Sequence, residues 1–126
     1  MELKEHKNLT IEKWRQFPFY KQILMIGTEF QRASSWIEKK DFREVNLCHE
    51  RALELVFLTI LYLTESQRYS NSNWEKNRLK ELLRFKECLQ QEYINKEKSF
   101  LTNKKLFSTL ILFSRESFSL LGSGNN

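Results

Sequence analysis

Residue types that could carry chemistry are sparse in this sequence, which holds two histidines and two cysteines among its 126 residues. His6 lies in the polar start of the chain, whereas His49 directly follows Cys48. Adjacent residues on a helix point about 100° apart, so these two side chains cannot both bind one ion. The spacings His-x-x-x-His and Cys-x-x-Cys do not occur, and neither does the Gly-x-Ser-x-Gly pattern of a nucleophilic serine. The sequence therefore predicts no metal site and no cofactor.

Arg43 and His49 form the other arrangement with catalytic potential. Their spacing, Arg-x-x-x-x-x-His, resembles the ribonuclease motif of HEPN domains, which are small and all-helical. The resemblance implies that Arg43 would stabilise phosphate charge and that His49 would act as a general acid or base on a ribose hydroxyl. Six steps along a helix place the two side chains about 120° apart, so they would have to converge across a dimer. An HEPN-type ribonuclease or toxin-like RNA-binding protein is the enzymatic alternative.

The composition is that of one soluble helical domain. Hydrophobic residues make up 40% of the chain and charged residues 29%, and only three glycines and one proline occur beside ten phenylalanines. So few turn-forming residues argue against a many-stranded fold. The longest apolar run, residues 55–63, is far shorter than the roughly 20 residues of a membrane-spanning helix. With no secretory signal visible and too few cysteines for a disulfide framework, we expect a cytoplasmic protein whose Cys48 and Cys88 are buried free thiols.

The net charge of +5 is modest, and it disfavours nucleic acid as a partner. Lys76, Lys80 and Arg84 recur every four residues and predict a basic ladder along one helix. Glu81 lies within a turn of this ladder and should weaken its field. A solvated helix face is the plain interpretation, and an acidic partner or nucleic acid is the alternative.

Apolar periodicity and capping residues predict five helices. Thr10 should cap a short helix ending at Arg15, and a longer helix should follow Pro18 and end near Lys39 and Lys40. Asp41 should cap a helix over about 42–66. We expect Gly27, inside the first long helix, to allow close packing by a neighbour.

Two further helices complete the predicted fold. Ser72 should cap the next one, and Thr102 or Asn103 the last, whose apolar stripe runs to Phe118. Short connections between long helices predict an all-α protein, an antiparallel up-down four-helix bundle with a short N-terminal helix. Residues 1–9 should be disordered or frayed, residues 10–120 should form the single domain, and residues 121–126 should be a flexible tail.

Residues 22–26, with the sequence Gln-Ile-Leu-Met-Ile, begin a resemblance to the flagellin export chaperone FliS family. The charged turn at 38–41, the stretch 51–56 and the spacing of the last two helices extend it over about residues 20–118. The resemblance implies a bundle that binds amphipathic segments of a client protein in grooves between helices, without chemistry. The candidate contacts are apolar positions on the first two long helices: Ile23, Ile26, Phe30, Leu58 and Tyr62.

Residues 41–44 together with 50–55 also resemble the second helix of a tetratricopeptide repeat, but no second copy follows. This similarity implies only a helical hairpin. Aromatic residues near the predicted helix ends could either cover the bundle or form an interaction surface; they are Trp14, Phe17, Phe19, Tyr20, Trp36 and Trp74.

The sequence therefore predicts a non-enzymatic protein- or peptide-binding bundle, chaperone-like or an adaptor. The expected partner is a protein client or a second copy of the chain, with a homodimer left open and no membrane association. Besides the ribonuclease, a homo-oligomeric structural module is the remaining alternative.

Overall fold

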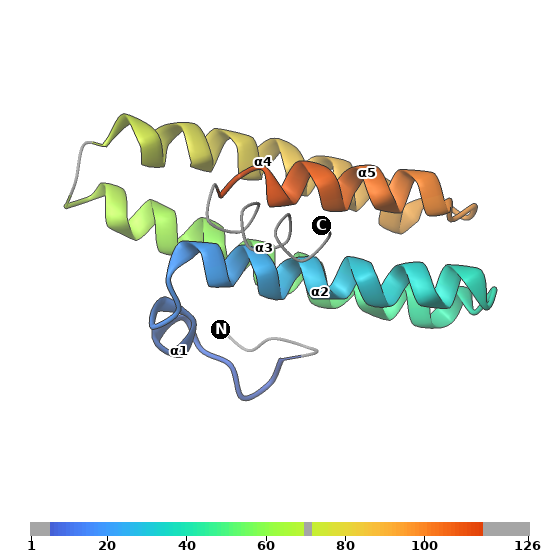
Figure 1. Ribbon diagram of the computed structural model, residues 1–126. Helices are drawn as coiled ribbons and strands as arrows, with labels where there is room; N and C mark the ends of the chain where they lie inside the picture. The colour runs from blue at the N-terminus through green and yellow to red at the C-terminus, as the bar shows by residue number, and fades with distance from the viewer. Residues whose placement is uncertain (1–5, 70–71, 115–126) are drawn as a thin grey trace, which may run out of the picture.

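A computed structural model describes residues 6–69 and 72–114 of the chain. Within these ranges every regular element is a helix. The helices are α1 (Ile11–Arg15), α2 (Phe19–Glu38), α3 (Phe42–Gln67), α4 (Asn73–Ile94) and α5 (Phe100–Ile111). The four long helices run alternately up and down, and α1 lies beside them (Figure 1). The predicted all-α bundle with a short N-terminal helix is confirmed. The predicted tail at 121–126 and Phe118 lie outside the described residues.

Side-chain caps begin four of the helices. The side-chain oxygens of Thr10, Asp41 and Ser72 accept hydrogen bonds from backbone N–H groups three residues on, as predicted. The prediction for α5 was wrong, because its cap is Ser99, whose hydroxyl accepts from the Thr102 N–H at 3.3 Å. Asn103 cannot serve as the cap, since its side chain is buried and bonded to α2.

The turn between α2 and α3 explains why α2 ends where it does. Lys40 has a φ of 60°, in the left-handed region that favours glycine. The N–H of Asp41 reaches back to the carbonyl of Trp36 at 2.9 Å, and the N–H of Lys40 reaches that of Ile37 at 3.0 Å. These bonds satisfy carbonyls at the helix end and reverse the chain within three residues, so α3 packs antiparallel to α2.

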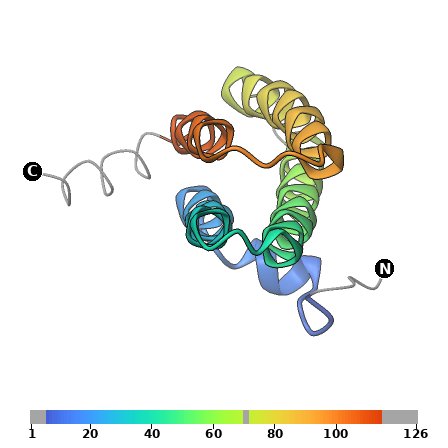
Figure 2. The ribbon, with the colours of Figure 1, turned by 90° about the vertical axis from the view of Figure 1, so that its right-hand side faces the viewer.

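The helices surround one main core, but the packing around it is uneven. In sequence order each long helix contacts the next, and α2 also packs closely on α5. Figure 2 shows this ring end-on, with α1 outside it beneath α3. The contact between α4 and α5 is the least extensive of those within the ring. The weak side of the bundle therefore lies between these two helices.

Two features bind the other sides together. A Cβ placed on Gly27 would lie 3.1 Å from the Phe107 ring, which confirms that Gly27 allows close packing of α2 on α5. Trp14 of α1 is fully buried, and its indole N–H donates to the Thr59 hydroxyl of α3 at 3.0 Å. The aromatic residues near helix ends therefore differ in burial. Trp14 and Phe19 are in the core, whereas Trp74 is 49% exposed. Among the described helices, none has both the length and the apolarity to cross a bilayer.

Candidate functional site

Most of the apolar positions expected to bind a client lie in the core of the bundle. Ile23, Ile26 and Phe30 are fully buried and Leu58 is 1% exposed, whereas Tyr62 is partly buried. A bundle must bury its most regular apolar stripes against its own helices. In this conformation four of these five side chains offer no surface to a partner.

Arg43 and His49 are not brought together within the chain. Arg43 is exposed on the first turn of α3, whereas His49 is 1% exposed and faces inward. Burial lowers the pKa of His49 to about 4, and the positive charge of Lys98 also lowers it. An acid–base role requires an imidazole that a substrate can reach, and this one is sealed in the fold.

The imidazole of His49 faces the side-chain amide of Asn103 on α5. Its amide nitrogen donates to the Phe30 carbonyl at 2.8 Å and to the Ser34 hydroxyl at 2.7 Å. Its carbonyl oxygen lies 3.5 Å from Nε2 of His49, which favours the tautomer with the proton on Nε2. These contacts join α5 to both α2 and α3, so the role they support for His49 is structural.

A groove of about 520 Å³ lies on the surface between α4 and α5 and is hereafter called the α4–α5 groove. Its floor is apolar and includes Phe85, Leu106 and Phe113. Its other lining residues are Asn77, Lys80, Glu81, Arg84, Cys88, Thr102, Lys105 and Thr109. Along α4 the lining runs from Asn77 to Cys88, eleven residue steps or about 16 Å at 1.5 Å per residue. The groove is therefore an elongated trough about three helical turns long.

The floor of the groove is continuous with the core. The Phe85 ring lies 5.8 Å from that of Phe30 and 5.7 Å from that of Phe113, both edge to face. Phe85 and Phe113 are 3% and 7% exposed, so they form a well-packed base rather than loose side chains. A rigid apolar floor is suited to accept side chains from another molecule with little ordering cost.

Polar contacts fix both ends of the groove. At one end Nη1 of Arg78 donates to the Phe113 carbonyl at 3.2 Å and to Oε2 of Glu81 at 3.0 Å. At the other end Nζ of Lys98 donates to the carbonyls of Glu92 and Tyr93 at 2.5 and 2.7 Å, at the end of α4. Burial raises the pKa of Glu92 and lowers that of Lys98 in this turn. Arg78 thus links α4 to the residues just after α5, whereas Lys98 secures the loop between the two helices to the end of α4.

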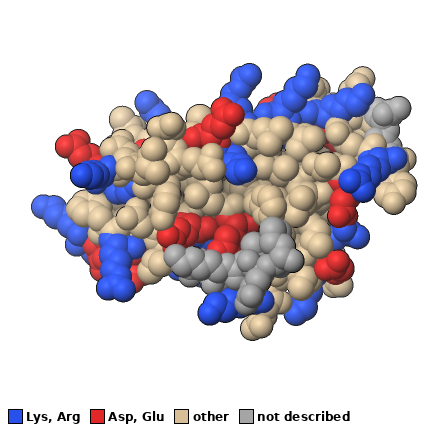
Figure 3. All heavy atoms as spheres, turned by 180° about the vertical axis from the view of Figure 1, so that it is seen from behind, with Lys and Arg blue, Asp and Glu red and all other residues tan. Residues whose placement is uncertain are grey.

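The rim of the groove is basic. Lys80 and Arg84 on α4 and Lys105 on α5 are exposed and line it. They form no ion pair with any residue in the described ranges, and the one carboxylate of the lining, Glu81, is paired with Arg78. Figure 3 shows several Lys and Arg side chains along the upper edge of the molecule, with Asp and Glu side chains among them. The groove therefore joins an apolar floor to a cationic rim.

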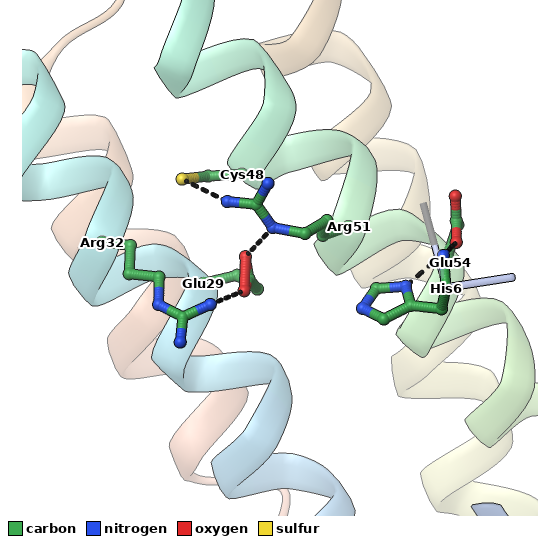
Figure 4. A network of polar contacts seen from close by, with 6 residues as sticks. All are labelled: His6, Glu29, Arg32, Cys48, Arg51 and Glu54. Carbon is green, nitrogen blue, oxygen red and sulfur yellow. Dashed lines mark hydrogen bonds and ion pairs between the residues drawn. The ribbon is translucent and has the colours of Figure 1, made fainter. Parts of the chain in front are cut away.

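A cluster of charged residues around the buried carboxylate of Glu29 lies on the other side of the bundle. The Glu29 carboxylate, 5% exposed, binds Arg32 and Arg51 at 2.7 Å each. Arg51 also donates to Sγ of Cys48 at 3.3 Å, as Figure 4 shows. Burial raises the pKa of the Cys48 thiol, although Arg51 opposes the shift. This cluster joins α2 to α3, and it keeps the Glu29 carboxylate away from solvent.

The N-terminal segment is attached to α3 through His6 and Glu54. Oε1 of Glu54 accepts from the backbone N–H of His6 at 3.0 Å and lies 2.9 Å from its Nδ1 (Figure 4). Residue 6 belongs to the stretch predicted to be disordered or frayed, yet it is held against α3 here.

Sequence reasoning missed most of the groove. It predicted a buried Cys88, which is instead exposed on the groove wall. The signal it did record was the basic ladder, of which Lys80 and Arg84 reach the rim. Burial of Cys48 was predicted correctly.

Within the described residues, no group of three or more His, Cys, Asp or Glu side chains is arranged to hold a metal ion. Comparison with protein-family models, curated proteins and solved structures found no match for this chain.

Proposed function

We propose that this chain is a non-enzymatic binding module that accepts an amphipathic helical segment of a client protein in the α4–α5 groove. The main observation behind this proposal is the apolar trough, about 520 Å³ in volume, on the weakly packed side of the bundle. A chaperone-like or adaptor role in the cytoplasm, as the FliS resemblance implies, is part of the proposal. The client, however, would use this groove rather than the stripes of α2 and α3.

The dimensions of the groove favour a helix as the occupant. A trough of about 16 Å between two antiparallel helices matches three turns of a third helix, which presents apolar residues at i, i+3 or i+4, and i+7. Such a stripe would lie over the small exposed parts of Phe85, Leu106 and Phe113, which are 3%, 8% and 7% exposed, and over the apolar parts of the other lining side chains. Burial of apolar surface contributes about 25 cal/mol per Å², so even a short segment gains several kcal/mol before ordering costs.

Cys88 provides a native reporter for a test, since it lines the groove and is exposed whereas Cys48 is buried. The probe is a capped peptide of about 14 residues, roughly four turns, with leucines on one face and glutamines elsewhere. We expect saturating peptide to slow the reaction of Cys88 with a disulfide thiol reagent several-fold.

A pair of variants on α5 supplies the control. Thr109→Trp should fill the groove and prevent both binding and protection, whereas Ser108→Trp, at an exposed position outside the lining, should not. Thermal melts would establish that both variants fold. An unchanged rate for Cys88 at every peptide concentration would overturn the proposal.

Self-association is the second candidate function, favoured by exposed apolar residues around the turn between α4 and α5. Ile94, Phe100 and Leu101 are 69%, 53% and 60% exposed. If this surface forms a homodimer, sedimentation should show a dimer that Leu101→Asp dissociates. Leu112→Asp, at a position 63% exposed beyond the last turn of α5, should leave it intact. A monomer at all concentrations would exclude this candidate.

A further inference from the structure

The charges around the α4–α5 groove lie on both of its walls. Lys80 and Arg84 are one turn apart on α4, and Lys105 lies on α5 across the floor. All three are exposed and form no ion pair with a described residue. Against these three cations stands one carboxylate, Glu81, which Arg78 already engages at 3.0 Å.

A helix seated in such a groove presents its apolar stripe to the floor and one flank to each wall. Residues flanking the stripe would therefore lie near the cations of α4 on one side and near Lys105 on the other. Basic flanks would be repelled by both walls, whereas acidic flanks would be attracted by both. Charge complementarity thus distinguishes between segments that share the same apolar face.

We infer that the segment bound in the α4–α5 groove is an acidic amphipathic helix, with carboxylates flanking both sides of its apolar stripe. This inference rests on the proposed function and adds the chemistry of the partner. Rim charges act mainly on specificity and association rate, so acidic partners should bind faster and neutral ones more weakly.

The test uses three capped peptides that share one leucine stripe and carry glutamate, glutamine or lysine at the flanking positions. Binding is measured by fluorescence anisotropy to the full chain at ~0.05 M and ~0.3 M salt. Exposed pairs contribute modestly, so three of them should make the glutamate peptide bind about tenfold more tightly than the glutamine peptide at low salt. That preference should shrink at high salt, and the lysine peptide should bind weakest.

Charge reversal on the protein provides the matched comparison. The double variant Lys80→Glu, Arg84→Glu should lose the preference for the glutamate peptide and gain affinity for the lysine peptide. The double variant Lys76→Glu, Lys104→Glu changes the net charge equally at exposed positions outside the groove lining, and it should retain most of the preference.

The outcomes separate this inference from the proposed function. Equal binding of the glutamate and glutamine peptides, still blocked by Thr109→Trp, would overturn the acidic specificity and leave the groove as a helix-binding site. No measurable binding of any peptide would overturn the proposed function and this inference with it. Slower reaction of Cys88 in the presence of dodecanoate, without binding of any peptide, would identify an anionic amphiphile as the occupant and also overturn the inference.

Discussion

Replacing His49 by glutamine should remove a specific part of the pH dependence of stability. The folded protein holds His49 neutral, because burial lowers its pKa to about 4 from an ordinary value of 6.5. The unfolded chain protonates this imidazole as pH falls through 6.5. Stability is therefore complete above about pH 6.5 and is lost as pH falls towards 4, since the unfolded state binds the extra proton.

The size of the effect follows from the two pKa values. A full separation of about 2.5 units corresponds to roughly 3 kcal/mol, of which about 2 kcal/mol is lost between pH 7 and pH 5. Urea unfolding followed by circular dichroism at the two pH values should show this loss in the native protein and a smaller one in His49→Gln. The difference between the proteins isolates His49, because their other titrating groups are the same.

An equal loss of stability in both proteins would refute the reasoning. It would mean that the imidazole reaches water in the folded state, and hence that Asn103 does not hold α5 over it.

Three further substitutions test the packing. Leu58→Ala, at a position 1% exposed, should lower the free energy of unfolding by about 2–5 kcal/mol in urea titrations; a change below about 1 kcal/mol would show that α3 is not central to the core. Glu29→Gln should cost about 2–3 kcal/mol, because it removes the charge of a carboxylate that is 5% exposed and binds both Arg32 and Arg51, and a melt unaltered at low and high salt would contradict this. Lys40→Gly should raise the unfolding free energy by about 0.5–1 kcal/mol by relieving the left-handed backbone at φ 60°; destabilisation would argue against that turn geometry.

Local signals in the sequence were sufficient to predict most of the fold. Thr10, Asp41 and Ser72 each cap the helix that was expected to follow them, because a short polar side chain can satisfy the free N–H groups of a first turn. The start of the last helix was predicted three or four residues too late, at Thr102 or Asn103 instead of Ser99. Asn103 has the residue type of a cap, but its amide finds buried partners on α2, and only tertiary packing could reveal this.

The candidate site was less predictable, because a groove depends on how closely two helices approach. Phe85 and Leu106 follow the same periodicity whether a neighbour covers them or leaves a trough. α5 packs closely on α2 at Gly27 and contacts α4 less extensively, and single-residue types do not encode this difference. Cys88 was misplaced for the same reason, since its exposure depends on the space left by α5.

The most direct test of the proposed groove is a nuclear magnetic resonance titration of the labelled full chain with the glutamate-flanked peptide. We predict that the largest shift changes will fall on residues of the groove, including Phe85, Leu106 and Phe113, with smaller changes at Glu29 and Cys48 on the opposite side. Changes concentrated on α2 and α3 instead, or none at saturating peptide, would contradict the account.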